Sequence, residues 1–398
     1  MSTACATGLS TATAAATAGR TAARDALDGL GGEEPILCQV FSSSTYDPEP
    51  VVEAVRDVLG TEPALIGCVS TGEFTERETA DHAVAVGLVA SDELTVTTGV
   101  GTGLSENVTA AVRSAVAPLP IDGSEYPYQS AITLHDGLTG LGERLALVLQ
   151  RKLGPDVSVA GGSASDNYAL ESTPVFCDGR VVEDGIVVAY LESERRLSVS
   201  VDHGHEPISE PMTVTDSDGN VVHAFDGTPA LDAWLDVVGD RARERFGVDP
   251  DELTPGSEAL VQVMGEFEFG VDQGDGYKVR WPQVVGPESR SLKFAVDVPA
   301  GTVMRVMHGH PDDQIASARR TARAAVEGLD GPPAGGFVYD CSCREIILGD
   351  RFGEAVAAID AEVGAPFCGF ETYGETCLRK GQMSGFHNTT TVMILFPE

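Results

Sequence analysis

Short apolar runs alternate along the chain with segments in which apolar residues recur every three or four positions. The first kind of run is typical of buried strands and the second of amphipathic helices. In three stretches, at about 1–94, 95–201 and 303–398, the pattern predicts a helix, a strand, a second helix, a strand, a turn and a further strand. A strand–helix–strand step of about 30 residues favours a parallel strand pair. The strand after the turn is close in sequence and favours an antiparallel pair.

The three stretches keep nearly constant offsets, which indicates an internal repeat. Each opens on a glycine, reaches its first central strand after the same number of residues, and has a second glycine at its next strand. The opening glycines are Gly8, Gly103 and Gly309, and the later ones are Gly67, Gly162 and Gly369. In the first stretch we expect a turn at Gly8 and a helix that is capped by Ser10 and runs to about Leu27.

Residues 202–299 do not fit the repeat. The Asp218-Gly219-Asn220 turn between Val- and Thr-rich runs predicts a hairpin, and Thr228 is the expected N-cap of a helix. Further strands are expected at 261–269, 277–285 and 291–298. The predicted fold class is α/β, with mixed β-sheets flanked by helices, built from three repeated α-β-α-β-turn-β units with a β-rich insertion before the third.

We expect two domains. The first, residues 1–225, holds two repeat units at about 1–94 and 95–201 together with the hairpin. The second, residues 226–398, holds a helix and strands at 226–302 and the third unit at 303–398.

The charge of the chain excludes several classes of partner. The 26 basic and 61 acidic residues give a net charge of −35, which argues against nucleic acid and against anionic lipid. The chain has no apolar run of about 18 residues that would predict a membrane span, and its N-terminus lacks the features of a secretory signal. The eight cysteines form no Cys-x-x-Cys pair. We therefore expect a cytoplasmic protein with reduced thiols.

The polar turns after the repeated strands are the first candidates for a binding site. Open α/β folds bind ligands where strands end, and bare backbone amides with hydroxyl groups suit a polar or anionic ligand. The structural alternative is a tight turn that needs a positive φ. Because the turns occur at equivalent positions, we expect them to share one site. Glu73 and Glu375 occupy equivalent positions there, where the default alternative is a solvated glutamate.

Histidine and cysteine motifs supply further candidates. His203-Gly204-His205 and His308-Gly309-His310 have the alternating spacing of metal ligands, but no glutamate or cysteine lies at a supporting spacing. We expect turn or ligand-contact histidines, no metal and no cofactor. Cys341 and Arg344 follow the third central strand. Arg344 is a candidate for binding a carboxylate, since its guanidinium fork matches carboxylate geometry.

These motifs resemble those of the FIST family of sensory domains (F-box and intracellular signal transduction proteins). The resemblance rests on VFSSSTYDPEPVVEAV, LIGCVSTGEF, GGSASDN and DHGHEPI in the N-terminal half. In the C-terminal half it rests on FDGTPALDAW, DCSCR, GFETYGE and FHNTT. It covers nearly the whole chain, and the order and spacing of the motifs make it fairly specific.

The resemblance implies that the protein senses a small molecule, an amino acid or a derivative, in signal transduction. It also implies a separate kinase- or chemoreceptor-type partner, because the chain carries no output module of its own. The candidates for ligand binding, Cys341 among them, are the positions of this sequence that match the family's motifs. The ligand-binding candidates are Ser70, Thr71, Gly72, Glu73, Gly162, Ser163, Asp166, Asn167, Cys341, Arg344, Tyr373, Gly374 and Glu375.

Two other functions remain open from the sequence. One is an acyl-transfer or hydrolytic enzyme that depends on a thiol or a serine, with Cys341 as nucleophile and His203 or His387 as base. A nearby arginine or a helix N-terminus would lower the pKa of such a thiol. The other is a non-catalytic scaffold for a signalling partner.

The excess of acidic residues predicts adaptation to high internal salt, as in a halophilic archaeon. Self-repulsion of the negative charges strains a compact fold in dilute buffer. Salt screens this repulsion, and the screening length falls to about 3 Å at 1 M. We therefore expect the melting temperature to continue to rise as KCl is increased beyond about 1 M. Calorimetric melting across a KCl series measures this, and a melting temperature with no gain above that concentration contradicts it.

Overall fold

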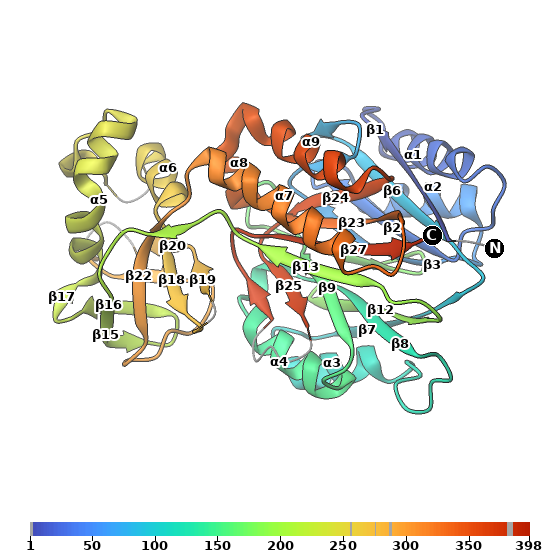
Figure 1. Ribbon diagram of the computed structural model, residues 1–398, viewed down its shortest axis with the longest axis horizontal. Helices are drawn as coiled ribbons and strands as arrows, with labels where there is room; N and C mark the ends of the chain where they lie inside the picture. Colours follow the sequence, from blue (N-terminus) through green and yellow to red (C-terminus); the bar gives the residue numbers. More distant parts are fainter. Residues whose placement is uncertain (1–2, 255–256, 275, 286–288, 380–384) are drawn as a thin grey trace.

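The computed structural model describes residues 3–254, 257–274, 276–285, 289–379 and 385–398. The chain folds into several mixed β-sheets covered by helices, as Figure 1 shows. The predicted α/β class is therefore confirmed. Among the helices within these ranges, none is both long and apolar enough to cross a membrane.

The first sheet contains a parallel pair with an antiparallel neighbour. Strand β6 pairs antiparallel with both β1 and β2, and β2 pairs parallel with β3. Two helices, α1 and α2, pack against each other over this part of the chain. The elements are β1 (Ala4–Ser10), α1 (Ala15–Gly29), β2 (Leu37–Ser43), α2 (Pro48–Leu59), β3 (Ala64–Ser70) and β6 (Val84–Ala90).

The second sheet has the same arrangement of strands. Strand β12 pairs antiparallel with β7 and β8, and β8 pairs parallel with β9. Helices α3 and α4 contact each other. The elements are β7 (Leu94–Thr102), α3 (Val108–Val116), β8 (Tyr128–His135), α4 (Gly142–Leu153), β9 (Ser158–Ser163) and β12 (Gly185–Ser193).

The third sheet repeats the arrangement with strands from both halves of the chain. Strand β27 pairs antiparallel with β13 and β23, and β23 pairs parallel with β24. Helices α7 and α9 pack together above it (Figure 1). The elements are β13 (Ser198–Asp202), α7 (Pro311–Glu327), β23 (Pro333–Cys341), α9 (Phe352–Val363), β24 (Phe367–Thr372) and β27 (Thr391–Pro397). The expected parallel and antiparallel pairs are thus present, whereas a repeat origin of the three units stays a prediction.

Each sheet receives one strand from another part of the chain. Strand β4 (Glu73–Thr75) of the first unit pairs with β24, β25 (Glu375–Leu378) of the third pairs with β9, and β10 (Val175–Cys177) of the second pairs with β3. All three exchanges are antiparallel. The three turns that precede these strands therefore lie between sheets.

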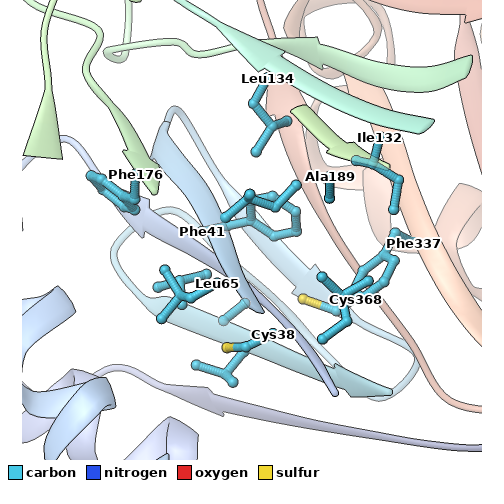
Figure 2. Close-up of a cluster of buried hydrophobic side chains, with 14 of the residues drawn as sticks. Cys38, Phe41, Leu65, Ile132, Leu134, Phe176, Ala189, Phe337 and Cys368 are labelled. Carbon is cyan, nitrogen blue, oxygen red and sulfur yellow. The ribbon is translucent and has the colours of Figure 1, made fainter. Parts of the chain in front are cut away.

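The main hydrophobic core lies where the three sheets face one another. In Figure 2 side chains from all three converge, and the labelled residues are Cys38, Phe41, Leu65, Ile132, Leu134, Phe176, Ala189, Phe337 and Cys368. Phe41 packs on Phe370 with ring centroids 4.5 Å apart. Inside this core the Gln39 side chain bonds the Tyr339 hydroxyl at 3.0 Å, which joins the first sheet to the third.

The strand glycines that recur at nearly equal spacing in the three units have a role in packing. Gly67 and Gly369 lie within β3 and β24, and neither has a positive φ. An added Cβ would overlap the Phe176 ring at Gly67 and the Phe74 ring at Gly369. Phe176 and Phe74 both belong to the exchanged strands. The tight-turn alternative is therefore wrong for these two positions, because the missing side chain makes room for an incoming aromatic ring.

The insertion forms a separate body with its own core, at the left of Figure 1. Its core surrounds the buried Trp234, whose indole N–H donates to the Phe267 carbonyl at 2.9 Å. The predicted hairpin is present. The elements are β14 (Glu206–Pro207), β15 (Met212–Asp218), β16 (Val221–Phe225), β17 (Thr228–Pro229), α5 (Ala230–Phe246), α6 (Glu258–Glu266), β18 (Phe269–Asp272), β19 (Tyr277–Arg280), β20 (Pro282–Val284), β21 (Leu292–Phe294) and β22 (Val303–His308).

Several local predictions were wrong. Gly8 and Ser10 belong to strand β1, and Ala14 is the N-cap of α1. Residues 261–266 form part of α6, where Ser257 caps the helix through the Leu260 amide at 3.2 Å. Thr228 lies in β17, so Pro229 is the N-cap of α5. Cys341 is the last residue of β23, and a short helix, α8 (Ser342–Leu348), follows it.

Replacing Gly369 by alanine should destabilise the fold by about 3 kcal/mol, since the new methyl group overlaps the Phe74 ring and the Val338 carbonyl. Urea unfolding of the purified protein measures the loss. The matched control is Gly353→Ala in α9, where an added Cβ meets nothing within 4 Å and a gain of up to about 1 kcal/mol is expected. Equal effects at the two positions would refute the packing argument.

Candidate functional site

The first and second turns are joined by direct hydrogen bonds. We call residues 70–73, 163–167 and 372–375 the first, second and third turns. The Ser165 hydroxyl accepts from the Thr71 amide at 2.9 Å and donates to the Glu371 carbonyl at 2.5 Å, which brings in the strand before the third turn. The Asn167 amide donates to the Thr71 hydroxyl at 3.1 Å. Segments from all three units therefore meet at one junction.

The second and third turns are joined as closely. Both the amide and the hydroxyl of Ser163 donate to the Gly374 carbonyl, at 2.8 and 3.0 Å. The Tyr373 hydroxyl donates to Asp166 at 2.7 Å and accepts from the Tyr168 amide at 2.6 Å. Asp166 also accepts three backbone amides of its own loop, residues 170–172. The polar groups of the turns are largely satisfied by one another.

Glycine and glutamate complete the junction. A Cβ on Gly72 would lie 2.7 Å from a carboxyl oxygen of Glu371, so a larger residue there would require the Glu371 side chain to move. Gly162 lies against the Thr372 side chain, in register with Glu375. The structure thus brings the predicted turn residues together, from Ser70 to Glu73, from Gly162 to Asn167 and from Tyr373 to Glu375.

The two equivalent glutamates are buried, which corrects the default expectation of a solvated side chain. Glu73 accepts from the Ser70 hydroxyl at 2.5 Å and the Ala83 amide at 3.0 Å. Glu375 accepts from the Thr372 hydroxyl and from the amide and hydroxyl of Thr390 at 3.1 and 2.8 Å. Burial raises the pKa of both carboxyl groups, to about 8 for Glu375, although the hydrogen bonds oppose the shift.

Arg344 makes four hydrogen bonds to protein groups with its five N–H donors. It is fully buried, and its guanidinium donates to Asp340 at 2.8 Å, to the side-chain oxygen of Gln314 at 2.5 Å, to Ser317 at 3.0 Å and to the Gln314 carbonyl at 3.0 Å. Thr391 donates to the other oxygen of Asp340 at 2.6 Å. A ligand carboxylate would have to displace Asp340, so these contacts favour a positioning role for Arg344.

A polar layer links Arg344 to the insertion. Because Gln314 gives its side-chain oxygen to Arg344, its amide nitrogen faces Nδ1 of His205, at 3.2 Å. Nδ1 must then accept, which places the proton of the neutral ring on Nε2. Nε2 lies 3.8 Å from Oε1 of Glu268, and both oxygens of Glu268 accept from the Thr389 hydroxyl at 2.7 and 2.9 Å.

Glu268 is a further buried carboxyl group, and it belongs to the insertion. It lies between α6 and β18 and is fully buried. Burial raises its pKa well above the ordinary value, and the neighbouring Glu375 raises it further. Sequence reasoning did not select Glu268 or Thr389. The available signal was an acidic residue within the apolar run VMGEFEF, where a solvated side chain is unexpected.

His387 and Glu375 face the same side of the second sheet, at its β25–β26 edge. Strand β26 (Phe386–His387) pairs antiparallel with β25, and Glu375 lies directly opposite His387. Side chains of directly opposite residues share a face. His387 is hydrogen-bonded to the Cys377 backbone, and burial lowers its pKa well below the ordinary value, with help from Lys278 and Arg280.

Buried polar atoms without a hydrogen-bond partner concentrate in this part of the molecule. Within the described ranges they lie on the segments where the insertion and the third unit meet. They are His205 Nε2, Trp281 Nε1, Thr376 Oγ1, His387 Nε2 and Asn388 Oδ1. The contact is direct there, since Lys278 and Arg280 of the insertion both donate to the Phe386 carbonyl, at 3.4 and 3.3 Å. Buried polar groups are normally paired, so this concentration points to a missing binding partner.

Backbone strain marks the same place. Thr389 has a φ of 55°, a conformation that β-branched residues rarely adopt. Its hydroxyl is held by Glu268, and the next residue holds Glu375. Strained residues of this kind cluster at functional sites.

The cysteines and the histidine pairs are placed less favourably for chemistry. Cys341 and Cys343 are buried, and the pKa of both thiols is raised, chiefly by burial for Cys341. His203 binds the Tyr277 carbonyl at 2.9 Å through Nε2. No group of three His, Cys, Asp or Glu side chains in the described ranges is arranged to hold a metal ion. The two His-x-His segments are the points where the chain enters and leaves the insertion, side by side through the β14–β22 pair.

Two protein-family models together match most of the chain. Residues 36–228 match the FIST N domain and residues 230–377 match the FIST C domain. Protein Rv0628c of Mycobacterium tuberculosis (strain H37Rv) is 28% identical over 407 residues, which cover 98% of each chain. Protein Mb0898c of Mycobacterium bovis is 26% identical, with 93% of each chain covered. Protein MJ1623 of Methanocaldococcus jannaschii is 22% identical over 64% of this chain and 48% of its own length.

Replacing Glu375 by glutamine should reduce the pH dependence of stability. The pKa of Glu375 is about 8 in the folded protein against 4.5 for an ordinary glutamate. A raised pKa gives a contribution that is complete below pH 4.5 and is lost as the pH rises through 8. Relative to the variant, the wild type should therefore lose ~3–5 kcal/mol over this range.

Urea unfolding at several pH values in constant salt measures the difference. The matched control is Glu327→Gln on the exposed side of α7, which changes the net charge equally. If both variants keep the slope of the wild type, the burial of an ionisable Glu375 does not control stability.

Proposed function

The chain belongs to the FIST family, and we propose on that premise that it senses a small polar molecule, an amino acid or a derivative. FIST domains are sensory domains of signal transduction. The observation that supports a binding role for this chain is the concentration of partnerless buried polar atoms between the insertion and the third unit. A small ligand with several hydrogen-bonding groups would satisfy them.

In this proposal the three turns form the frame of the site and the insertion forms its cover. Ser70, Thr71, Gly72, Ser163, Asp166 and Asn167 hold the junction through the hydrogen bonds described above, while Tyr373, Gly374 and Glu375 carry it towards the insertion. Cys341 adds a small apolar wall. Arg344 positions His205 through Gln314 rather than contacting the ligand.

Side chains of both signs of charge lie in and near the polar layer. Glu268 and Glu375 are acidic groups in the layer. Lys278 and Arg280, both buried, lie on the insertion near His387, and burial lowers the pKa of Lys278 to about 8. An amino acid carries one group of each sign, which suits this combination better than an uncharged metabolite does.

Signalling would follow from a change in how the insertion sits on the core. A ligand that bridges the two binds the closed arrangement better than an open one and shifts the population towards it. The two adjacent crossings at residues 203–206 and 308–310 would act as the hinge. We propose that the closed surface is read in the cytoplasm by a separate kinase- or chemoreceptor-type protein.

Titration calorimetry with a panel of amino acids, their amides and other small metabolites tests this function. The full chain in about 2 M KCl should bind at least one amino acid or derivative in a one-to-one complex. Mapping iodoacetamide labelling at neutral pH is the companion measurement, and we expect Cys341 to be unreactive until the protein unfolds. A panel without a ligand, together with rapid labelling of Cys341, would favour the thiol enzyme instead.

A further inference from the structure

Two buried carboxyl groups in the polar layer have no lysine or arginine partner among the described residues. Glu268 accepts from the Thr389 hydroxyl and faces His205 at 3.8 Å, while Glu375 accepts from Thr372 and Thr390. Throughout the described part of the chain, neither carboxyl group has a lysine or arginine within ion-pair distance. A charged carboxylate that is buried without a counter-ion is strongly disfavoured, so both groups stay neutral unless a cation arrives.

Two other carboxylates near this layer have an arginine partner, the buried Asp340 and the partly buried Glu143, whereas among the described residues the buried Glu73 and Glu371 resemble Glu268 in having none. Asp340 has Arg344 at 2.8 Å, and Glu143 has Arg280 at 3.0 Å. The chain contains 22 arginines and four lysines, so basic residues were available for pairing. The absence of one beside Glu268 and Glu375 leaves two neighbouring acidic groups that a bound cation would neutralise.

An unused hydrogen-bond acceptor lies on the same face. His387 is buried, shares the face of the β25–β26 edge with Glu375 and has no partner at Nε2. Because the ring is already bonded to the Cys377 backbone through its other nitrogen, Nε2 of the neutral ring is a free acceptor. The partnerless Oδ1 of the next residue, Asn388, is a further acceptor.

Donor-rich cations fit this set of groups. A protonated primary amine has one positive charge and three N–H donors. Glu268 and Glu375 each offer a charge-assisted acceptor, and His387 offers a neutral one. A quaternary ammonium has the charge but no donors. A ligand carboxylate has only hydrogen-bond acceptors, and it would face the three acceptors of this set without a donor.

We propose that Glu268, Glu375 and His387 form the subsite that recognises the protonated amine of the ligand, between the insertion and the third unit. This inference rests on the proposed sensory function and specifies which part of the ligand is read. Because Glu268 belongs to the insertion and the other two to the core, binding of the amine closes the two bodies on each other. Thr389 holds Glu268 in place for this contact.

Saturation-transfer NMR with three small probes tests the subsite. The probes are isopropylammonium, L-alanine and propionate, each offered to the full chain in high salt at neutral pH. Isopropylammonium and alanine should both receive saturation, since both carry the amine, and propionate should not. Tetramethylammonium controls for non-specific attraction to the acidic surface and should also give no signal.

Two variants locate the signal. Glu268→Gln and Glu375→Gln keep the size and hydrogen bonding of a protonated carboxyl group but cannot become anionic, so folding is retained while binding of the amine should weaken at least tenfold. The control is Glu76→Gln, a partly buried glutamate that accepts from Thr7 at the other side of the third sheet. It should leave binding unchanged.

The outcomes separate this inference from the function on which it rests. A signal from propionate alone would overturn amine recognition while the sensory function stands. An amine signal that survives both glutamine variants would place the subsite elsewhere. No signal from either amine would also overturn the inference, and the calorimetric panel would then decide the sensory function independently.

Discussion

Pairing of strand edges is the constraint on which the rest of the structure depends. Strands β3, β9 and β24 would each present a row of unpaired backbone groups at the centre of the molecule. Each edge is covered by a strand that follows the turn of a different unit. Since all three exchanges occur around one centre, the turns must cross there, and their polar groups are buried together.

The residue types of the turns follow from this crossing. A hydroxyl bonds a glutamate three positions later in two of the turns, which satisfies both groups without water. Glycine replaces larger residues where an exchanged strand brings a phenylalanine across, as at Gly67 and Gly369. Backbone amides that face the centre are taken by carbonyls and hydroxyls of a neighbouring turn. The junction is therefore rigid and well suited to support a site beside it.

The insertion extends this polar centre instead of closing it. The contacts run from Asp340 through Arg344 and Gln314 to His205, and then across 3.8 Å to Glu268 and Thr389. Satisfied hydrogen bonds around Arg344 give way to partnerless atoms on both sides of the boundary, which belong to His205 and Trp281 on the insertion and to Thr376, His387 and Asn388 on the third unit. Such a gradient is expected where two bodies enclose a ligand, because the groups that contact the ligand are left without protein partners.

Local patterns in the sequence determined the order of helices and strands in the three units, their parallel pairs and the polar character of the turns. These depend on periodicity and spacing within about 30 residues. The motif order also identified the FIST family. The sequence did not reveal β1 or the helical state of residues 261–266, where neighbouring strands and the insertion core override weak local preferences.

Only the tertiary structure decided which strands are exchanged and which acidic residues are buried. Glu73, Glu268 and Glu375 are indistinguishable by composition from the many solvated acids of a chain with a net charge of −35. The hydrogen bond that holds Glu268 joins segments more than a hundred residues apart. Long-range packing sets the dielectric and the hydrogen-bond partners of a side chain, and the local pattern held a signal only for Glu268, through its place in an apolar run.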